Sequence, residues 1–176
     1  MGVVMGLSDF LNGDGNGVSI DFSNVEKNLG FNLHDDLKKF YSMAFVKYVR
    51  GDIKFKDKKF LVPTGNKEFD NWFSFNRCNG KIEVQLNLIK DESCVESTVE
   101  KAAKEWMGPY DFGRRFMIGD LGVKIGQILI LFNNDTGAVE WLDCDYGNFG
   151  TLEKDPNGKL ANSMEEFLGK LRENLV

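Results

Sequence analysis

The segment NGDGNGVSIDFS, at residues 12–23, alternates oxygen-bearing side chains with glycines in the manner of a calcium-binding loop. Its first, third and fifth positions hold Asn12, Asp14 and Asn16, whose side-chain oxygens can ligate a hard cation. The last position holds Ser23 where such loops carry a bidentate glutamate, so a bound ion would lose ligand oxygens and a formal charge. We therefore interpret the segment as a glycine-rich surface turn, and we expect neither a metal nor a cofactor in this chain.

A second candidate for chemistry is the pair of carboxylates Asp143 and Asp145, which flank Cys144 just after a predicted strand. On an extended segment the two side chains point to the same face, where they could serve as acid and base or hold magnesium. Their nearest sequence neighbours include no His, Arg or Lys that would complete a reaction. We interpret them as solvated residues at a turn.

The single histidine, His34, precedes Asp35 and Asp36 in what should be the first turn of a helix. To act as a general base it must meet a nucleophile held by another segment. The chain has no nucleophile elbow, no papain-like cysteine signature and no glycine-rich loop before a Lys-Ser or Lys-Thr pair. We expect His34 to be a solvated residue at a helix start, and the chain not to be an enzyme.

Acidic residues outnumber basic ones, 27 to 22, and the net charge of -5 disfavours a nucleic acid as the direct partner. One basic segment, residues 47–60, interleaves Lys and Arg with aromatic side chains, as in a groove for single-stranded nucleic acid. Its period is that of a strand, because Lys54 and Lys56 would share one side and Ile53 and Phe55 the other. The segment is therefore predicted to be an edge strand with a solvated outer face.

At 176 residues and 42% hydrophobic composition, the chain can bury one core, so we predict a single domain over residues 1–176. Residues 1–20 are expected to be a flexible or irregular lead-in. The longest unbroken apolar run, residues 128–132, is far shorter than the roughly 20 residues needed to span a bilayer. The amino-terminal segment lacks the basic and apolar regions of a secretion signal, so we expect a cytoplasmic protein with reduced cysteines and no membrane partner.

Helix starts are marked by residues whose side chains can accept a hydrogen bond from free amides of the first turn. The predicted helices begin near Ser23, Asn32, Ser93 and Ser163. After each of the three serines a glutamate follows three residues later, as in a capping box. Gly30 is predicted to end the first helix, and Gly108 with Pro109 to end the third.

Strands are indicated by a period of two, which is clearest at residues 81–89 and also present at 69–75. Residues 127–132 are apolar on both faces and suit a central strand, followed by a hairpin turn at 133–137 and a further strand at 138–142. The pattern predicts an α+β domain with a mainly antiparallel sheet of about six strands. Helices are expected to pack against this sheet at the chain ends and from a central insertion.

Three glycines, Gly119, Gly122 and Gly126, precede the predicted central strand. The first two are expected to allow positive φ in a tight turn, and the third to allow a bulge or a close backbone approach. We interpret all three as residues that shape the fold.

These segments together resemble the SUKH superfamily, which includes bacterial immunity proteins and the fungal cell-wall assembly regulator. The resemblance is carried by NLHDDLKKF at 32–40, IGDLGVKIGQILILF at 118–132, TGAVEW at 136–141 and LANSMEEFLGKL at 160–171. It extends from about Val25 to Leu171 through short, mostly structural motifs.

The resemblance implies a non-catalytic protein-binding domain, most often an immunity protein that neutralises a cognate bacterial toxin, frequently a nuclease. A nuclease must be basic to hold its substrate, so an inhibitor with a net charge of -5 would be steered toward it. A regulatory adaptor that binds a cell-envelope or signalling partner is an alternative, as the fungal relative indicates. A third alternative is an unrecognised enzyme that uses His34, Cys144 or the pair of Asp143 and Asp145.

Candidate contact residues for a basic toxin combine negative charge with an aromatic side chain able to anchor an interface. They are Asp111, Asp120, Glu140, Asp143, Asp145 and Tyr146. The first two lie near the glycines that precede the central strand, and the others belong to the hairpin strand and the residues after it.

Overall fold

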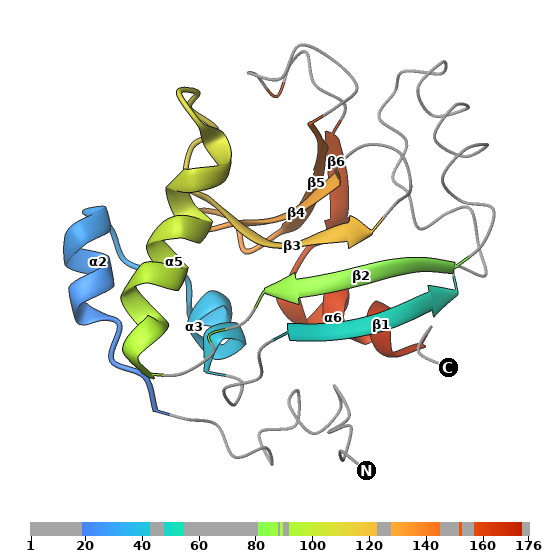
Figure 1. Ribbon diagram of the computed structural model, residues 1–176, viewed down its shortest axis with the longest axis horizontal. Helices are drawn as coiled ribbons and strands as arrows, with labels where there is room; N and C mark the ends of the chain where they lie inside the picture. Colours follow the sequence, from blue (N-terminus) through green and yellow to red (C-terminus); the bar gives the residue numbers. More distant parts are fainter. Residues whose placement is uncertain are drawn as a thin grey trace.

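The computed structural model describes residues 19–42, 48–54, 81–87, 89, 92–122, 128–144, 152 and 157–173. Within these residues, one antiparallel sheet is accompanied by helices at both ends of the described chain and between the second and third strands (Figure 1). The predicted α+β class and the antiparallel sheet are therefore confirmed. Other predictions concern residues outside the described ones: most of the calcium-like loop, the strand at 69–75, and Gly126, Asp145 and Tyr146.

The strands are β1 (Tyr48–Lys54), β2 (Lys81–Asn87), β3 (Arg115–Gly122), β4 (Ile128–Asn133), β5 (Val139–Asp143) and β6 (Asn157–Ala161). They pair in chain order from β1 to β6, and each neighbour runs antiparallel to the last. Among the described strands, β1 thus lies at one edge of the sheet, as predicted for the basic segment.

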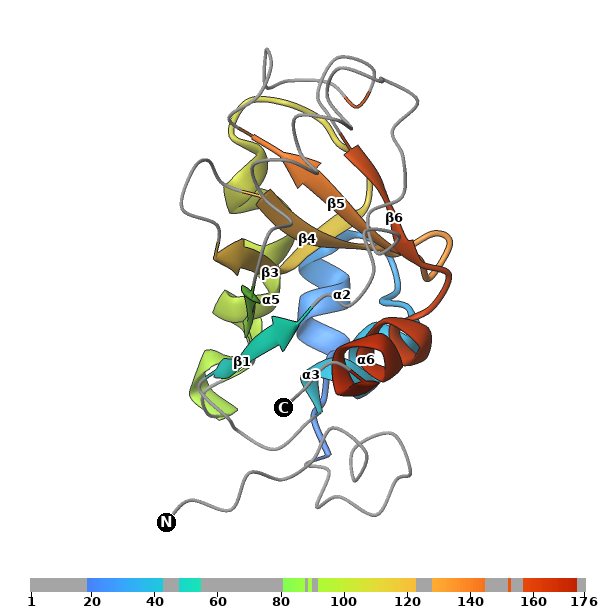
Figure 2. The same ribbon diagram turned by 90° about the vertical axis from the view of Figure 1, so that its right-hand side faces the viewer.

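The α-helices are α2 (Ser23–Leu29), α3 (Asp35–Tyr41), α5 (Val95–Lys104) and α6 (Met164–Glu173). Two 3₁₀ helices, η2 (Glu92–Cys94) and η3 (Glu105–Met107), adjoin the two ends of α5. Figure 2, turned by 90°, shows α3 beside α6, and the two helices contact one another.

The central position predicted for residues 127–132 is confirmed for 128–132, because β4 lies between β3 and β5 and all of its residues are buried. Its alternate side chains enter two different apolar clusters. Ile130 belongs to the larger cluster, which every α-helix contacts, and Leu131 to a smaller cluster on the opposite face of the sheet. A strand needs apolar residues at every position when both of its faces are covered.

The larger cluster, which we call the main core, lies between one face of the sheet and the helices. Its largest fully buried side chains are Trp141, Tyr41, Phe40, Phe116, Phe132 and Phe167. The smaller cluster, which we call the outer cluster, consists of Phe112, Leu129, Leu131 and Leu142, with Trp106, Met107, Met117, Cys144 and Leu152 packed against it. The sheet therefore has a helical face and a second face covered by η3 and loops.

The tight turn predicted at Gly119 and Gly122 is wrong, because both glycines lie within β3. The pairing between β3 and β4 shifts register between Met117 and Gly119, so the chain forms a bulge inside the strand. The positive φ values among the described glycines occur elsewhere, at Gly30, Gly108, Gly113 and Gly137. Pairing with β4 requires an extended backbone here, and a bulge adds a residue without ending the strand.

β2 and β3 separate from one another at the start of β3. Their pairing runs only from Glu83 with Gly122 to Leu86 with Gly119, so the first half of β3 is left without β2 beside it. Figure 1 shows β2 and β3 diverging there, with α5 alongside β3.

The helix ends agree with the sequence patterns only in part. Gly30 ends α2 with φ 80, as predicted. The capping box expected at Ser23 is wrong, because Asp21 Oδ1 accepts hydrogen bonds from both the amide and the hydroxyl of Ser23. Glu26 instead accepts from the amide of Leu33, which links α2 to the segment before α3.

Three helix starts can be compared with their predicted caps. The residue before α3 is His34 and not Asn32 as predicted, and its Nδ1 accepts a hydrogen bond from the Asp36 amide. At α5 the predicted Ser93 lies in η2, one residue before the N-cap position. At α6 the Ser163 hydroxyl accepts from the Glu166 amide, as predicted.

Candidate functional site

The predicted contact residues that the structure describes do not form one patch. Asp111 is exposed in the connection between η3 and β3, and Asp120 is half-buried in β3. Glu140 and Asp143 both lie in β5 but on opposite faces, because the register pairs Glu140 with Leu131 of the outer cluster and Asp143 with Ile128 of the main core.

Glu140 is held in a half-buried polar network. Arg115 Nε donates to its Oε2 at 2.6 Å, and Asn133 Nδ2 donates to its Oε1 at 3.0 Å. Arg115 also donates through Nη1 to the carbonyl of Phe112 at 2.7 Å. The network ties β3, β4 and β5 to the loop before β3, so Glu140 has a structural role.

Asp143 is completely buried, with 0% of its surface exposed. A carboxylate in that position cannot touch a partner at the surface of this structure. The sequence pattern placed it with Asp145 at a solvated turn, whereas its pairing with Ile128 places it on the inner face of the sheet.

The connection between η3 and β3 carries the only large apolar side chain that is exposed among the described residues, Tyr110, at 46%. Tyr110 is not among the contact residues predicted from the sequence. Its available signal was an aromatic residue beside Asp111 in a segment punctuated by glycine and proline, which marks a loop.

This connection has a defined conformation. Gly108 and Gly113 adopt φ values of 58 and 69, and the Gly113 amide donates to Asp111 Oδ1 at 2.8 Å. The Tyr110 amide donates to the Met107 carbonyl at 3.2 Å. Phe112 is buried at 2% exposure and anchors the segment in the outer cluster. Tyr110 and Asp111 are thus presented side by side on a fixed loop.

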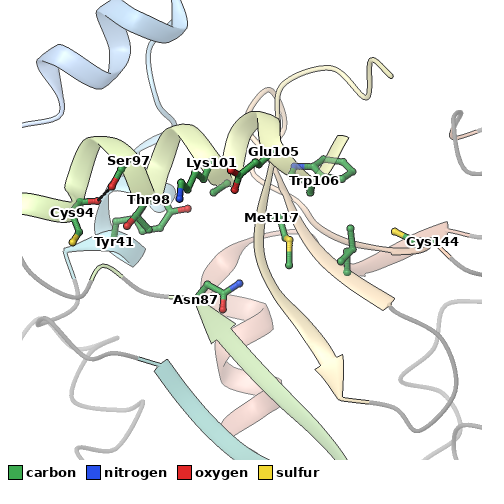
Figure 3. Close-up of a pocket in the computed structure, with 12 residues that line it drawn as sticks. Tyr41, Asn87, Cys94, Ser97, Thr98, Lys101, Glu105, Trp106, Met117 and Cys144 are labelled. Carbon is green, nitrogen blue, oxygen red and sulfur yellow. Dashed lines mark hydrogen bonds between the residues drawn. The ribbon is translucent and has the colours of Figure 1, made fainter. Parts of the chain in front are cut away.

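A cavity of about 680 Å³ lies between the η2–α5–η3 segment and the strands β2, β3 and β4 (Figure 3). Its lining residues are Tyr41, Asn87, Cys94, Ser97, Thr98, Lys101, Ala102, Glu105, Trp106, Met117, Leu129 and Cys144. They come from α3, β2, the η2–α5–η3 segment, β3, β4 and the residue after β5. Burial raises the pKa of the Tyr41 hydroxyl in the wall of this cavity, so that group is neutral at physiological pH.

The residues considered for catalysis lie in different places. The imidazole of His34 accepts the Asp36 amide at 3.1 Å and packs edge-on against Phe132 at the start of α3. Cys144 is half-buried in the wall of the cavity. In the described part of the chain, no group of three or more His, Cys, Asp or Glu side chains is arranged to hold a metal ion.

No protein-family model matches the chain, and a search among curated proteins finds no similar sequence. Of the helices in the described ranges, none combines the length and the apolar character needed to cross a bilayer.

Proposed function

We propose that this chain is a non-catalytic protein-binding domain of the immunity type, which neutralises a basic bacterial toxin, possessing a SUKH-like fold and acting in the cytoplasm. The sequence segments given above support the family, and the antiparallel α+β architecture is compatible with it. The observation that carries the binding role is the exposed Tyr110 next to Asp111 on the fixed loop before β3.

A large aromatic side chain on a rigid loop is suited to anchor an interface. Tyrosine contributes a large contact area with little loss of side-chain freedom, and its hydroxyl can hydrogen-bond at the edge of the buried region. Because the loop is already held by Gly113, Phe112 and Met107, little further ordering is needed when a partner binds.

The charge around Tyr110 supports a basic partner. Asp111 and Glu105 are both exposed close to it in sequence, and the chain as a whole carries a net charge of -5. The nearby cation Arg114 is paired with Asp135 at 3.3 Å. Attraction between this surface and a basic protein would accelerate association, most strongly at low ionic strength.

The first test is whether the product of the neighbouring reading frame is a toxin that this chain binds. Purified proteins should form a complex, and cells that produce the toxin should grow only when this chain is also produced. Survival without complex formation, or binding only to an envelope or signalling protein, would contradict the immunity role.

The second test addresses the proposed contact surface. Tyr110→Ala should speed dissociation of the complex by about tenfold or more. Asp111→Asn keeps the acceptor for the Gly113 amide but removes the charge, so it should slow association at low salt and have little effect at high salt. Glu165→Gln removes the same charge from the exposed surface of α6 and serves as the matched control. Equal effects of the two charge removals would remove this loop from the interface.

A further inference from the structure

Two buried polar groups of the cavity wall have no hydrogen-bond partner among the described residues. They are the hydroxyl of Tyr41, a residue only 1% exposed, and the indole Nε1 of Trp106. Both residues line the cavity, and both groups can donate a hydrogen bond. Buried donors are almost always paired in folded proteins, so an unpaired set along one cavity indicates that an acceptor belongs there.

Charged side chains at the exposed side of the cavity restrict the charge of that acceptor. Lys101 and Glu105 lie one helical turn apart, and both are exposed lining residues. Figure 3 shows them extending from the helical segment above the cavity. The ammonium of Lys101 favours an anion, whereas the carboxylate of Glu105 opposes a dianion such as phosphate.

The remaining wall is suited to an apolar body. Ala102, Met117 and Leu129 contribute hydrocarbon and thioether surface, and Met117 can adapt its shape to a ligand. The volume of about 680 Å³ falls within the range of roughly 300–1,000 Å³ that is typical of small-molecule sites.

We propose that this cavity binds a small amphipathic carboxylate, an organic monoanion with an apolar body. The carboxylate accepts hydrogen bonds from Lys101 and Tyr41, and the apolar body lies against Met117 and Leu129, toward the indole of Trp106. This site does not depend on the proposed toxin partner, because its ligand can be tested with the isolated protein.

The test uses octanoate as the probe and the indole signal of Trp106 as the readout. The chain has only three tryptophans, so ¹H–¹⁵N spectra resolve few indole signals, and the Trp106→Phe variant identifies the one that belongs to Trp106. Octanoate should shift that signal in a saturable manner. 1-Octanol and octylammonium carry the same apolar body without the negative charge, and each should bind at least about tenfold more weakly.

Matched variants separate binding from folding. Lys101→Met removes the ammonium but keeps most of the side-chain length, and it should weaken octanoate binding about tenfold. Lys104→Met removes an exposed lysine of the same helix that does not line the cavity, and it should leave binding unchanged.

Tyr41→Phe provides a second, independent way to separate ligand binding from folding. The variant removes a hydroxyl that has no partner among the described residues, so the free protein should be no less stable than the parent in urea. Octanoate binding should nevertheless weaken, because the ligand loses a donor. The proposal is overturned if folded protein shows no Trp106 response at millimolar octanoate, if octylammonium binds as well as octanoate, or if both lysine variants behave alike.

Discussion

The imidazole of His34 lies directly against Gly137, so that the turn between β4 and β5 and the start of α3 fit together only without a side chain at position 137. A Cβ atom built on Gly137 would lie 2.9 Å from Nε2 and 3.1 Å from Cε1 of His34. Asn134 of the same turn reinforces the contact, because its Oδ1 accepts from the His34 amide at 2.8 Å and its Nδ2 donates to the Asn32 carbonyl at 3.0 Å. The hairpin turn therefore positions the amino-terminal helices on the sheet.

Gly137→Ala should destabilise the protein by about 2 kcal/mol or more, since it adds a clash with His34 to the strain of a φ of +73. The matched control is Gly30→Ala, at φ +80, where a Cβ meets nothing within 4 Å. The control should be destabilised only by the strain of a positive φ, by about 1 kcal/mol. Urea denaturation measures both, and equal losses would contradict the steric role of His34.

His34→Ala should lower the free energy of unfolding by about 1–2 kcal/mol, because it removes the acceptor for the Asp36 amide and the edge contact with Phe132. His34→Asn restores a good cap without restoring the ring, so it should recover part of that loss. If asparagine is no better than alanine at this position in thermal or urea unfolding, the cap contributes nothing.

Glu26 should make stability depend on pH in the acidic range. Its Oε1 accepts from Lys38 Nζ at 2.6 Å and from the Leu33 amide at 2.8 Å. The hydrogen bond from Lys38 is the largest cause that holds the pKa of this carboxyl below its ordinary value of 4.5. Since the unfolded chain takes up the proton first as pH falls, the contribution is complete above about pH 4.5 and disappears as pH drops through the folded-state pKa.

Glu26→Gln should therefore lower the free energy of unfolding by about 1 kcal/mol at neutral pH. The variant should also lose less stability than the parent as the pH falls through the acidic range. Lys38→Met removes the other partner and should raise the pKa of Glu26 toward its ordinary value, which a ¹³C NMR titration of the carboxyl can follow. An unchanged Glu26 titration in the Lys38 variant would show that the ion pair does not form in solution.

Gly158→Ala should destabilise the sheet by about 1–3 kcal/mol, because a Cβ there would lie 2.6 Å from Nε1 of the buried Trp141. Gly169→Ala is the matched control, for which the opposite change in stability is expected. Gly169 lies inside α6 with open space around its position, so alanine should stabilise the helix by about 0.5–1 kcal/mol. Thermal unfolding should move in opposite directions for the two variants, and a stabilised Gly158→Ala would contradict the close packing of β5 and β6.

Octanoate should protect Cys144 from alkylation more strongly than Cys94, because Cys144 lies on the Met117 side of the proposed ligand cavity and Cys94 lies at its other end (Figure 3). Iodoacetamide labelling followed by peptide mass spectrometry measures each site separately. The protection should be lost in Lys101→Met and retained in Lys104→Met. Protection that persists in the Lys101 variant would place the octanoate elsewhere.

Local features of this protein were determined by nearby residues and could be predicted from the sequence. The continuous apolar run at 128–132 predicted a strand covered on both faces, and Gly30 predicted the end of α2. Each of these features depends on hydrogen bonds and side-chain periodicity within a few residues of the same segment.

Burial and proximity were decided only by the tertiary structure. Asp143 is buried because β5 pairs with β4 in one register, and an acidic residue after a strand does not reveal that register. His34 became the cap of α3 in place of Asn32 because Asn134, far along the chain, holds the backbone of this segment.

For the candidate sites too, some features can be predicted from the sequence and others depend on the tertiary structure. The acidic charge that favours a basic partner can be read from composition, whereas the exposure of Tyr110 depends on how Phe112 anchors its loop. The cavity is lined by residues of α3, β2, the η2–α5–η3 segment, β3 and β4. Such a space depends on the packing of segments that are distant in the chain, and interactions between neighbouring residues in the sequence do not determine it.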